Sequence, residues 1–119
     1  MRNFRELEVW KSSVLLVKNI YLLSESFPAT EKYGLISQIS RCAVSIPSNI
    51  AEGCSRTSQK DFSRFLQISL GSAFELETQL EIAKEVNFIN EIEYSKIIEE
   101  LHIIQKRIQS LKKYVDSKI

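Results

Sequence analysis

The sequence is poor in turn-forming residues: 119 residues contain three glycines and two prolines. β-Sandwiches and barrels need turn signals about every 8–12 residues, so this scarcity disfavours an all-β fold. The sequence also lacks a run of about 20 apolar residues that could cross a membrane, because Lys18 and Asn19 interrupt its longest apolar stretch. Its first residues mix both charge signs, unlike a signal peptide. We therefore expect a cytoplasmic protein without a membrane partner.

Cysteine and histidine are scarce as well. Cys42 and Cys54 fall on one predicted helix, about 18 Å apart along its axis, whereas a disulfide needs Cα atoms within about 7 Å. We therefore predict free thiols. The single histidine, His102, follows Glu99 with the E-x-x-H spacing of di-iron bundles, but such a centre draws on two of these segments. A lone histidine also argues against Ser–His or Cys–His catalysis, so we predict no enzymatic activity, metal or cofactor.

The net charge of +1, from 16 basic and 15 acidic residues, provides no global field for nucleic acid or anionic lipid. A local group of basic residues near the C-terminus is the candidate for nucleic-acid contact: Lys106, Arg107, Lys112 and Lys113. These residues trail the acidic residues of the same predicted helix, as the helix dipole prefers, so they have a structural explanation too. We expect no interleaved aromatic platform, which disfavours recognition of single-stranded RNA.

The length and the 44% hydrophobic content are typical of a single domain over residues 1–119. Apolar residues recur at helical spacing in four stretches, at about residues 7–27, 31–55, 59–86 and 91–117. The links between them are short, which forces neighbouring helices to run antiparallel. The sequence thus predicts an all-α, up-down-up-down four-helix bundle.

Local signals mark the helix ends. Pro28 ends the first helix, Thr30 and Gly53 are expected to bound the second, and Ser58 and Asn90 are predicted N-caps of the third and fourth. The first helix carries two neighbouring apolar stripes: Leu7, Trp10, Val14, Val17 and Tyr21, and then Leu16, Ile20, Leu23 and Phe27.

Pro47 lies inside the second helical pattern, where it removes a backbone donor and crowds the carbonyl of Ala43. Because the apolar stripe keeps its phase from Ile46 to Ile50, we predict one helix kinked at Pro47. The kink either wraps the helix around the core or frees the carbonyl of Ala43 for a partner. Gly71, inside the third helix, is tolerable if another backbone approaches closely.

A polar stripe runs along the second helix opposite its apolar face and has acidic counterparts on the third. Its candidate residues are Arg41, Ser45, Asn49, Glu52 and Glu75. An arginine, an amide and carboxylates on one face favour an interhelical or intersubunit hydrogen-bond network. The alternatives are a ligand or partner site and a solvated helix face.

The sequence holds more apolar residues than one inward stripe per helix requires. Those that project away from the main stripes are Leu15, Leu22, Ile68, Phe74 and Ile82, with Ile103 on the fourth helix. Several at heptad spacing indicate a second buried surface, so we predict a homo-oligomer in which they form the contact.

Several segments resemble a known family. They read FRELEVW from Phe4, EKYGL from Glu31, QISR from Gln38 and SIPSNIAEG from Ser45, followed by matches around Arg64, Gly71 and Glu75. The chain is similar over nearly its whole length to the four-helix-bundle proteins encoded in intervening sequences of bacterial 23S ribosomal RNA. By position, the matching polar residues are Arg41, Ser45, Asn49, Glu52 and Glu75.

The resemblance implies a ring assembly, commonly a pentamer, and a link to ribosomal RNA. Similar proteins also serve as accessory subunits of diversity-generating retroelements, where a basic surface contacts nucleic acid and a reverse transcriptase. We therefore expect a non-enzymatic, oligomeric binding module associated with ribosomal RNA or an RNA-containing complex. The alternative is a protein-interaction scaffold that touches no nucleic acid.

Overall fold

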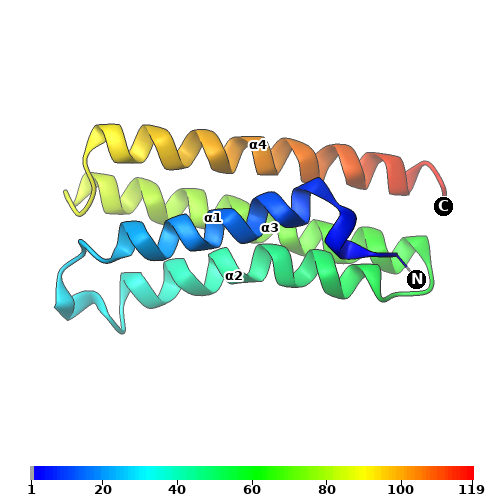
Figure 1. Cartoon of the computed structure of the whole chain (residues 1–119), viewed down its shortest axis with the longest axis horizontal. Helices are drawn as coiled ribbons and strands as arrows, with labels where there is room; N and C mark the ends of the chain where they lie inside the picture. The colour runs from blue at the N-terminus through cyan, green and yellow to red at the C-terminus, as the bar shows by residue number, and fades with distance from the viewer. Residues whose placement is uncertain (1) are drawn as a thin grey trace.

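The computed structural model describes residues 2–119, which form four long helices and two short 3-10 helices. These are η1 (Phe4–Glu6), α1 (Glu8–Ser24), η2 (Ala29–Glu31), α2 (Leu35–Cys54), α3 (Gln59–Glu85) and α4 (Glu91–Asp116). The four long helices lie side by side in an elongated bundle of 45 × 24 × 20 Å, with both chain ends at the same end (Figure 1). The predicted all-α, up-down-up-down bundle is confirmed. None of the helices in residues 2–119 combines the length and apolar character that a membrane span requires.

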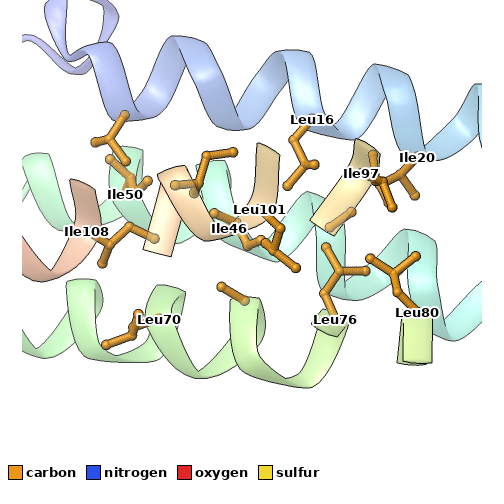
Figure 2. Packing of buried hydrophobic residues seen from close by; sticks show 14 of the residues in the cluster. Leu16, Ile20, Ile46, Ile50, Leu70, Leu76, Leu80, Ile97, Leu101 and Ile108 are labelled. Atoms are coloured by element: carbon orange, nitrogen blue, oxygen red, sulfur yellow. The ribbon is translucent and has the colours of Figure 1, made fainter. Parts of the chain in front are cut away.

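Each long helix packs against two neighbours, in the cyclic order α1, α2, α3, α4, and α2 and α3 share the most extensive interface. Aliphatic side chains from all four helices fill the interior (Figure 2). The fully buried ones include Leu16, Ile20, Ile46, Ile50, Leu66, Leu76, Leu80, Leu101, Ile104 and Ile108. Burying each of them is worth about 1.5–3 kcal/mol relative to leaving it exposed, so this single core accounts for the fold.

The helix α1 differs from prediction in its buried face and its end. Leu16 and Ile20 are fully buried, but Val14 and Tyr21, which belong to the other predicted apolar stripe, are 42% and 52% exposed. The helix has one inward arc because, of the long helices, α2 and α4 flank it. It ends at Ser24 instead of Phe27, because the chain leaves the α-helix in a turn at residues 25–26. Pro28 then keeps Phe27 itself out of the helical conformation. The Phe27 ring is buried, 5.5 Å from the ring of Phe88.

The helix α2 begins at Leu35, four residues later than predicted, and Thr30 is not its N-cap. Thr30 lies within η2, and Gly34 at φ −102° and ψ −112° separates the two helices. Glu31 supplies the cap instead, because its carboxylate accepts from the backbone N–H of Leu35 at 3.2 Å. The helix continues through Pro47, which is buried. A kink at Pro47 stays a prediction.

The predicted caps of α3 and α4 are confirmed. Ser58 accepts from the N–H of Asp61 at 3.1 Å, and Asn90 and Glu93 form a reciprocal capping box. Between the two helices, Asn87 adopts a positive φ of 64°. The N–H groups of Asn87 and Phe88 then return to the carbonyls of Lys84 and Ala83, which closes α3 with a Schellman motif.

The two helical glycines differ in their surroundings. Gly53 is buried in the last turn of α2, and a Cβ placed there would lie 2.8 Å from Cβ of Phe65 and 3.0 Å from Cδ1 of Phe62. It therefore permits the close approach of α2 and α3 and is not the end signal we predicted. Gly71 is exposed with nothing within 4 Å of such a Cβ, so no close approach of another backbone within residues 2–119 accounts for it.

Candidate functional site

A polar seam joins α2 to α3 and includes two of the predicted stripe residues. The hydroxyls of Ser45 and Ser72 lie 2.8 Å apart, and the amide of Asn49 donates to the carbonyl and hydroxyl of Ser45 at 2.8 and 2.9 Å. Deeper in the bundle, the buried hydroxyl of Ser69 donates to the carbonyl of Ile46 at 2.9 Å. These small side chains satisfy one another and let the helices approach closely, so the seam has a structural role.

The other three candidates of the stripe lie apart from this seam. Arg41 is exposed beside the outer groove between α1 and α2. Glu52 pairs with Arg56 one turn later at 3.5 Å. Glu75 lies on the exposed side of α3 near Cys42; burial raises the pKa of the Cys42 thiol, the Gln79 side chain opposes this, and the Glu75 carboxylate adds to it. Within one chain, the described residues do not join Arg41 to a carboxylate.

A second polar cluster, between α3 and α4, contains His102. Glu77 accepts from the amide of Gln105 at 2.8 Å, and its other carboxylate oxygen lies 3.2 Å from Nε2 of His102. The hydrogen bond from Gln105, reinforced by His102, lowers the pKa of Glu77. His102 thus pairs with Glu77 on the neighbouring helix, and residues 2–119 contain no group of three or more His, Cys, Asp or Glu placed to hold a metal ion.

The four basic candidates of α4 have different environments. Lys106 and Arg107 line a shallow groove of about 340 Å³ with Leu7 and Glu8, and Arg107 donates to the hydroxyl of Ser12. Lys112 pairs with Asp116 at 2.9 Å, while Lys113 is exposed. Tyr114 is 62% exposed in their midst. One exposed aromatic ring therefore lies next to these residues, which the expectation of no interleaved aromatic platform did not take into account.

The fold adds further cations to this group. The half of the bundle that carries the chain ends comprises residues 2–16, 45–72 and 104–119, and we call it the basic end (Figure 1). It holds eleven of the 16 basic residues: Arg2, Arg5, Lys11, Arg56, Lys60, Arg64, Lys106, Arg107, Lys112, Lys113 and Lys118. It holds five of the 15 acidic residues: Glu6, Glu8, Glu52, Asp61 and Asp116. The basic end thus has a formal excess of six positive charges, and the other half has an excess of five negative ones.

Sequence reasoning found the cations of α4 and missed those that join them in space. Arg2 and Arg5 come from the N-terminal segment, and Arg56, Lys60 and Arg64 come from the α2–α3 link and the start of α3. The net charge of only +1 for the whole chain gave no indication of this local group of basic residues. Assigning each charge to an end of the predicted antiparallel bundle would have revealed the separation, because the order of helices alone decides which ends meet.

Aromatic rings hold several of these cations. The guanidinium carbon of Arg2 lies 4.3 Å from the ring centre of Phe62, and Arg2 also donates to the carbonyl of Arg56 at 2.8 Å and to Gln59. Arg56 and Arg64 both lie over the ring of Phe65, at 4.7 and 4.9 Å. Such contacts fix the position of a charge while leaving its outward N–H groups free.

The predicted oligomer-contact residues are all exposed in the single chain. Leu15 and Leu22 of α1 are 52% and 54% exposed, and Ile68, Phe74 and Ile82 of α3 are 42%, 47% and 47% exposed. The helices α1 and α3 are diagonally opposite in the bundle, so these residues form two separate apolar faces. Large apolar groups gathered on both sides of a small domain are typical of interaction surfaces.

The geometry defines an all-α protein of the antiparallel four-helix-bundle class, with an excess of positive charge at one end and exposed apolar side chains on two outer faces. The model of the 23S rRNA-intervening sequence protein family matches residues 5–110. The chain belongs to this family.

A solved structure supports the assignment. A protein of unknown function from the S23 ribosomal protein family of Bacteroides thetaiotaomicron is 28% identical in sequence. The match covers 88% of this chain and 95% of that one, with a TM-score of 0.80. Comparison with curated protein sequences gave no match.

Proposed function

We propose that the protein is a non-enzymatic module that assembles with itself and binds RNA through its basic end. The separation of charge along the 45 Å axis carries this proposal. Phosphate binding depends on local positive charge, so a net charge of +1 does not oppose it when six excess positive charges lie at one end. The family name points to ribosomal RNA or an RNA-containing complex as the partner, and hence to the cytoplasm as the place of action.

Self-assembly is the second part of the proposal. Two opposite apolar faces, one on α1 and one on α3, favour a head-to-tail contact between copies that closes into a ring. The resemblance favours a pentamer. Light scattering at micromolar concentration should give a mass several times 13.7 kDa, and a monomer mass would refute self-assembly.

RNA binding is tested by titrating a structured ribosomal RNA fragment at about 50 and 200 mM salt. We expect binding at the lower salt and a steep loss at the higher one, because phosphate contacts release counterions. The variant K60E/K113E should bind more weakly, since both exposed lysines belong to the basic end. The matched variant K18E/K96E changes the same number of charges in the other half and should bind as the wild type does.

A protein-interaction scaffold without RNA binding is the second candidate. It is favoured by the outer groove between α1 and α2, of about 640 Å³, where Tyr33 is 88% exposed beside Tyr21 and Val44. An apolar protein contact changes little with salt, in contrast to phosphate binding. Absence of RNA binding at low salt would therefore favour this candidate.

A further inference from the structure

Three exposed arginines of the basic end are held against aromatic rings. Arg56 and Arg64 share the ring of Phe65, and Arg5 lies 5.6 Å from the ring centres of both Phe4 and Trp10. Among residues 2–119, neither Arg5 nor Arg64 has a side-chain ion pair or hydrogen-bond partner within the chain, and Arg56 has an exposed, 3.5 Å pair with Glu52. Their donor groups are therefore available.

An arginine that lies over a ring loses little further freedom when it binds a ligand. Its planar group presents paired N–H donors whose spacing matches two oxygens of one phosphate, which a lysine cannot do. Because Arg56, on the α2–α3 link, and Arg64, near the start of α3, share one ring, they place two such groups of paired donors close together. The exposed ion pair with Glu52 opens at small cost, since such pairs contribute little in water.

The same contacts decide which form of nucleic acid fits. Proteins that bind single strands offer open aromatic faces on which bases stack. Here Phe62 and Phe65 are 3% and 7% exposed and are covered by guanidinium groups. Tyr114 is exposed, but Lys118 lies over its ring at 5.3 Å. The basic end therefore offers positive charge and paired N–H donors for phosphate, and little exposed aromatic surface on which bases could stack.

We infer that Arg56 and Arg64, assisted by Arg5, are the phosphate-binding groups of this protein and that their ligand is the backbone of a base-paired RNA stem. This inference rests on the proposed RNA-binding function. Base pairing orders the phosphates in advance, which suits fixed donors. It also hides the base faces, for which this surface offers only the exposed ring of Tyr114, with Lys118 over it. The end of the bundle, 24 × 20 Å across, spans several phosphates of such a stem.

The test uses the full chain and two fluorescein-labelled probes, an RNA duplex of about 20 base pairs and one of its strands alone, at about 50 and 200 mM salt. The wild type should bind the duplex more tightly than the strand. R56Q/R64Q should lose about tenfold or more in duplex affinity and reduce the salt slope by about 2, since each lost phosphate contact removes about one unit. R56K/R64K should recover only part of this loss. K18Q/K96Q, with two charges removed from the other half, should match the wild type.

The remaining outcomes separate this inference from the function on which it rests. Binding that is lost in K106Q/K113Q and retained in R56Q/R64Q would keep the proposed function and overturn the role of the arginines. Full recovery in R56K/R64K, tighter binding of the single strand, or binding to anionic vesicles with none to the duplex would also overturn the inference. If neither RNA binds at low salt, the proposed function itself fails. Thermal melting of each variant verifies that it is folded.

Discussion

The carboxylate of Glu77 on α3 lies 3.2 Å from Nε2 of His102 on α4, while its other oxygen accepts from Gln105 at 2.8 Å. These contacts link the two helices near the middle of the bundle. They also show that His102, which follows Glu99 with the E-x-x-H spacing, pairs with Glu77 of another helix and not with Glu99.

The first prediction concerns the acid stability that Glu77 confers. The hydrogen bond from Gln105, with a contribution from His102, lowers the pKa of Glu77 from its ordinary value of 4.5. The stabilisation is therefore complete above that value and is lost as the pH falls through the lower, folded-state pKa. At pH 7, Glu77→Gln should lower the free energy of unfolding by about 1 kcal/mol, discounted for partial exposure. Denaturant unfolding from pH 3 to 7 measures it.

The control for this variant is Glu99→Gln, which changes an exposed carboxylate on α4. It should leave both the stability at pH 7 and its acid dependence close to those of the wild type. Equal acid dependence in Glu77→Gln and the wild type would contradict the account of Glu77.

The second prediction compares the two helical glycines. Gly53→Ala should destabilise the fold by about 1–3 kcal/mol, because the new methyl group would overlap Phe65 at 2.8 Å in a rigid backbone. Gly71→Ala should stabilise it by about 0.5–1 kcal/mol, because that site is open and alanine favours the helix. Urea denaturation measures both. The same sign of change in the two variants would contradict this comparison.

A third prediction concerns the start of α4. Asn90 accepts from the N–H of Glu93 at 2.8 Å, and the Glu93 carboxylate accepts from the N–H of Asn90 at 3.0 Å. Asn90→Ala should therefore cost about 1 kcal/mol of unfolding free energy. Thermal melting measures this change. Glu91→Ala, in the same turn, removes a side chain that makes no capping hydrogen bond, so it should lower the unfolding free energy clearly less.

The fourth prediction concerns the apolar face of α1. Leu15→Ser with Leu22→Ser should lower the mass of the assembly in light scattering while the helix content is retained, because both side chains are more than half exposed in the single chain. Leu16, between them in sequence, is fully buried, and Leu16→Ala should instead cost about 2–5 kcal/mol of stability. An unchanged mass in the double variant would exclude this face from the contact.

Much of the fold could be predicted from the sequence because its signals are local. Ser58 and Asn90 cap the helices that they were expected to cap, and the apolar spacing of α3 and α4 matches their buried faces. The segment around Gly34 was predicted wrongly, because the cap of α2 comes from a glutamate side chain four residues ahead of the helix and not from Thr30. Asn87 takes the left-handed position that glycine usually holds, so its helix end had no glycine to mark it.

The candidate site depended on positions distant in sequence and was therefore predicted less well. Ser45 and Asn49 are hydrogen-bonded to each other within α2, but their partner Ser72 comes from α3. The lysines of α4 could be recognised as a group because they lie close together in the sequence of one helix. Arg5 and Arg56 are distant from them in sequence, and only the antiparallel topology brings them to the same end of the bundle. Val14 was put on an apolar stripe of the first helix but is 42% exposed, because periodicity gives the apolar arc of a helix and not which part of that arc the neighbouring helices cover.

Both chain ends lie at the end of the bundle where α2 connects to α3 (Figure 1), and Arg56 and Arg64 belong to this connection and the start of α3. An affinity tag or fluorescent fusion attached at either terminus would therefore be placed next to the surface proposed to hold RNA. The turn around Asn87 lies at the opposite end and is exposed. It is the better site for a dye or a tether in experiments on RNA.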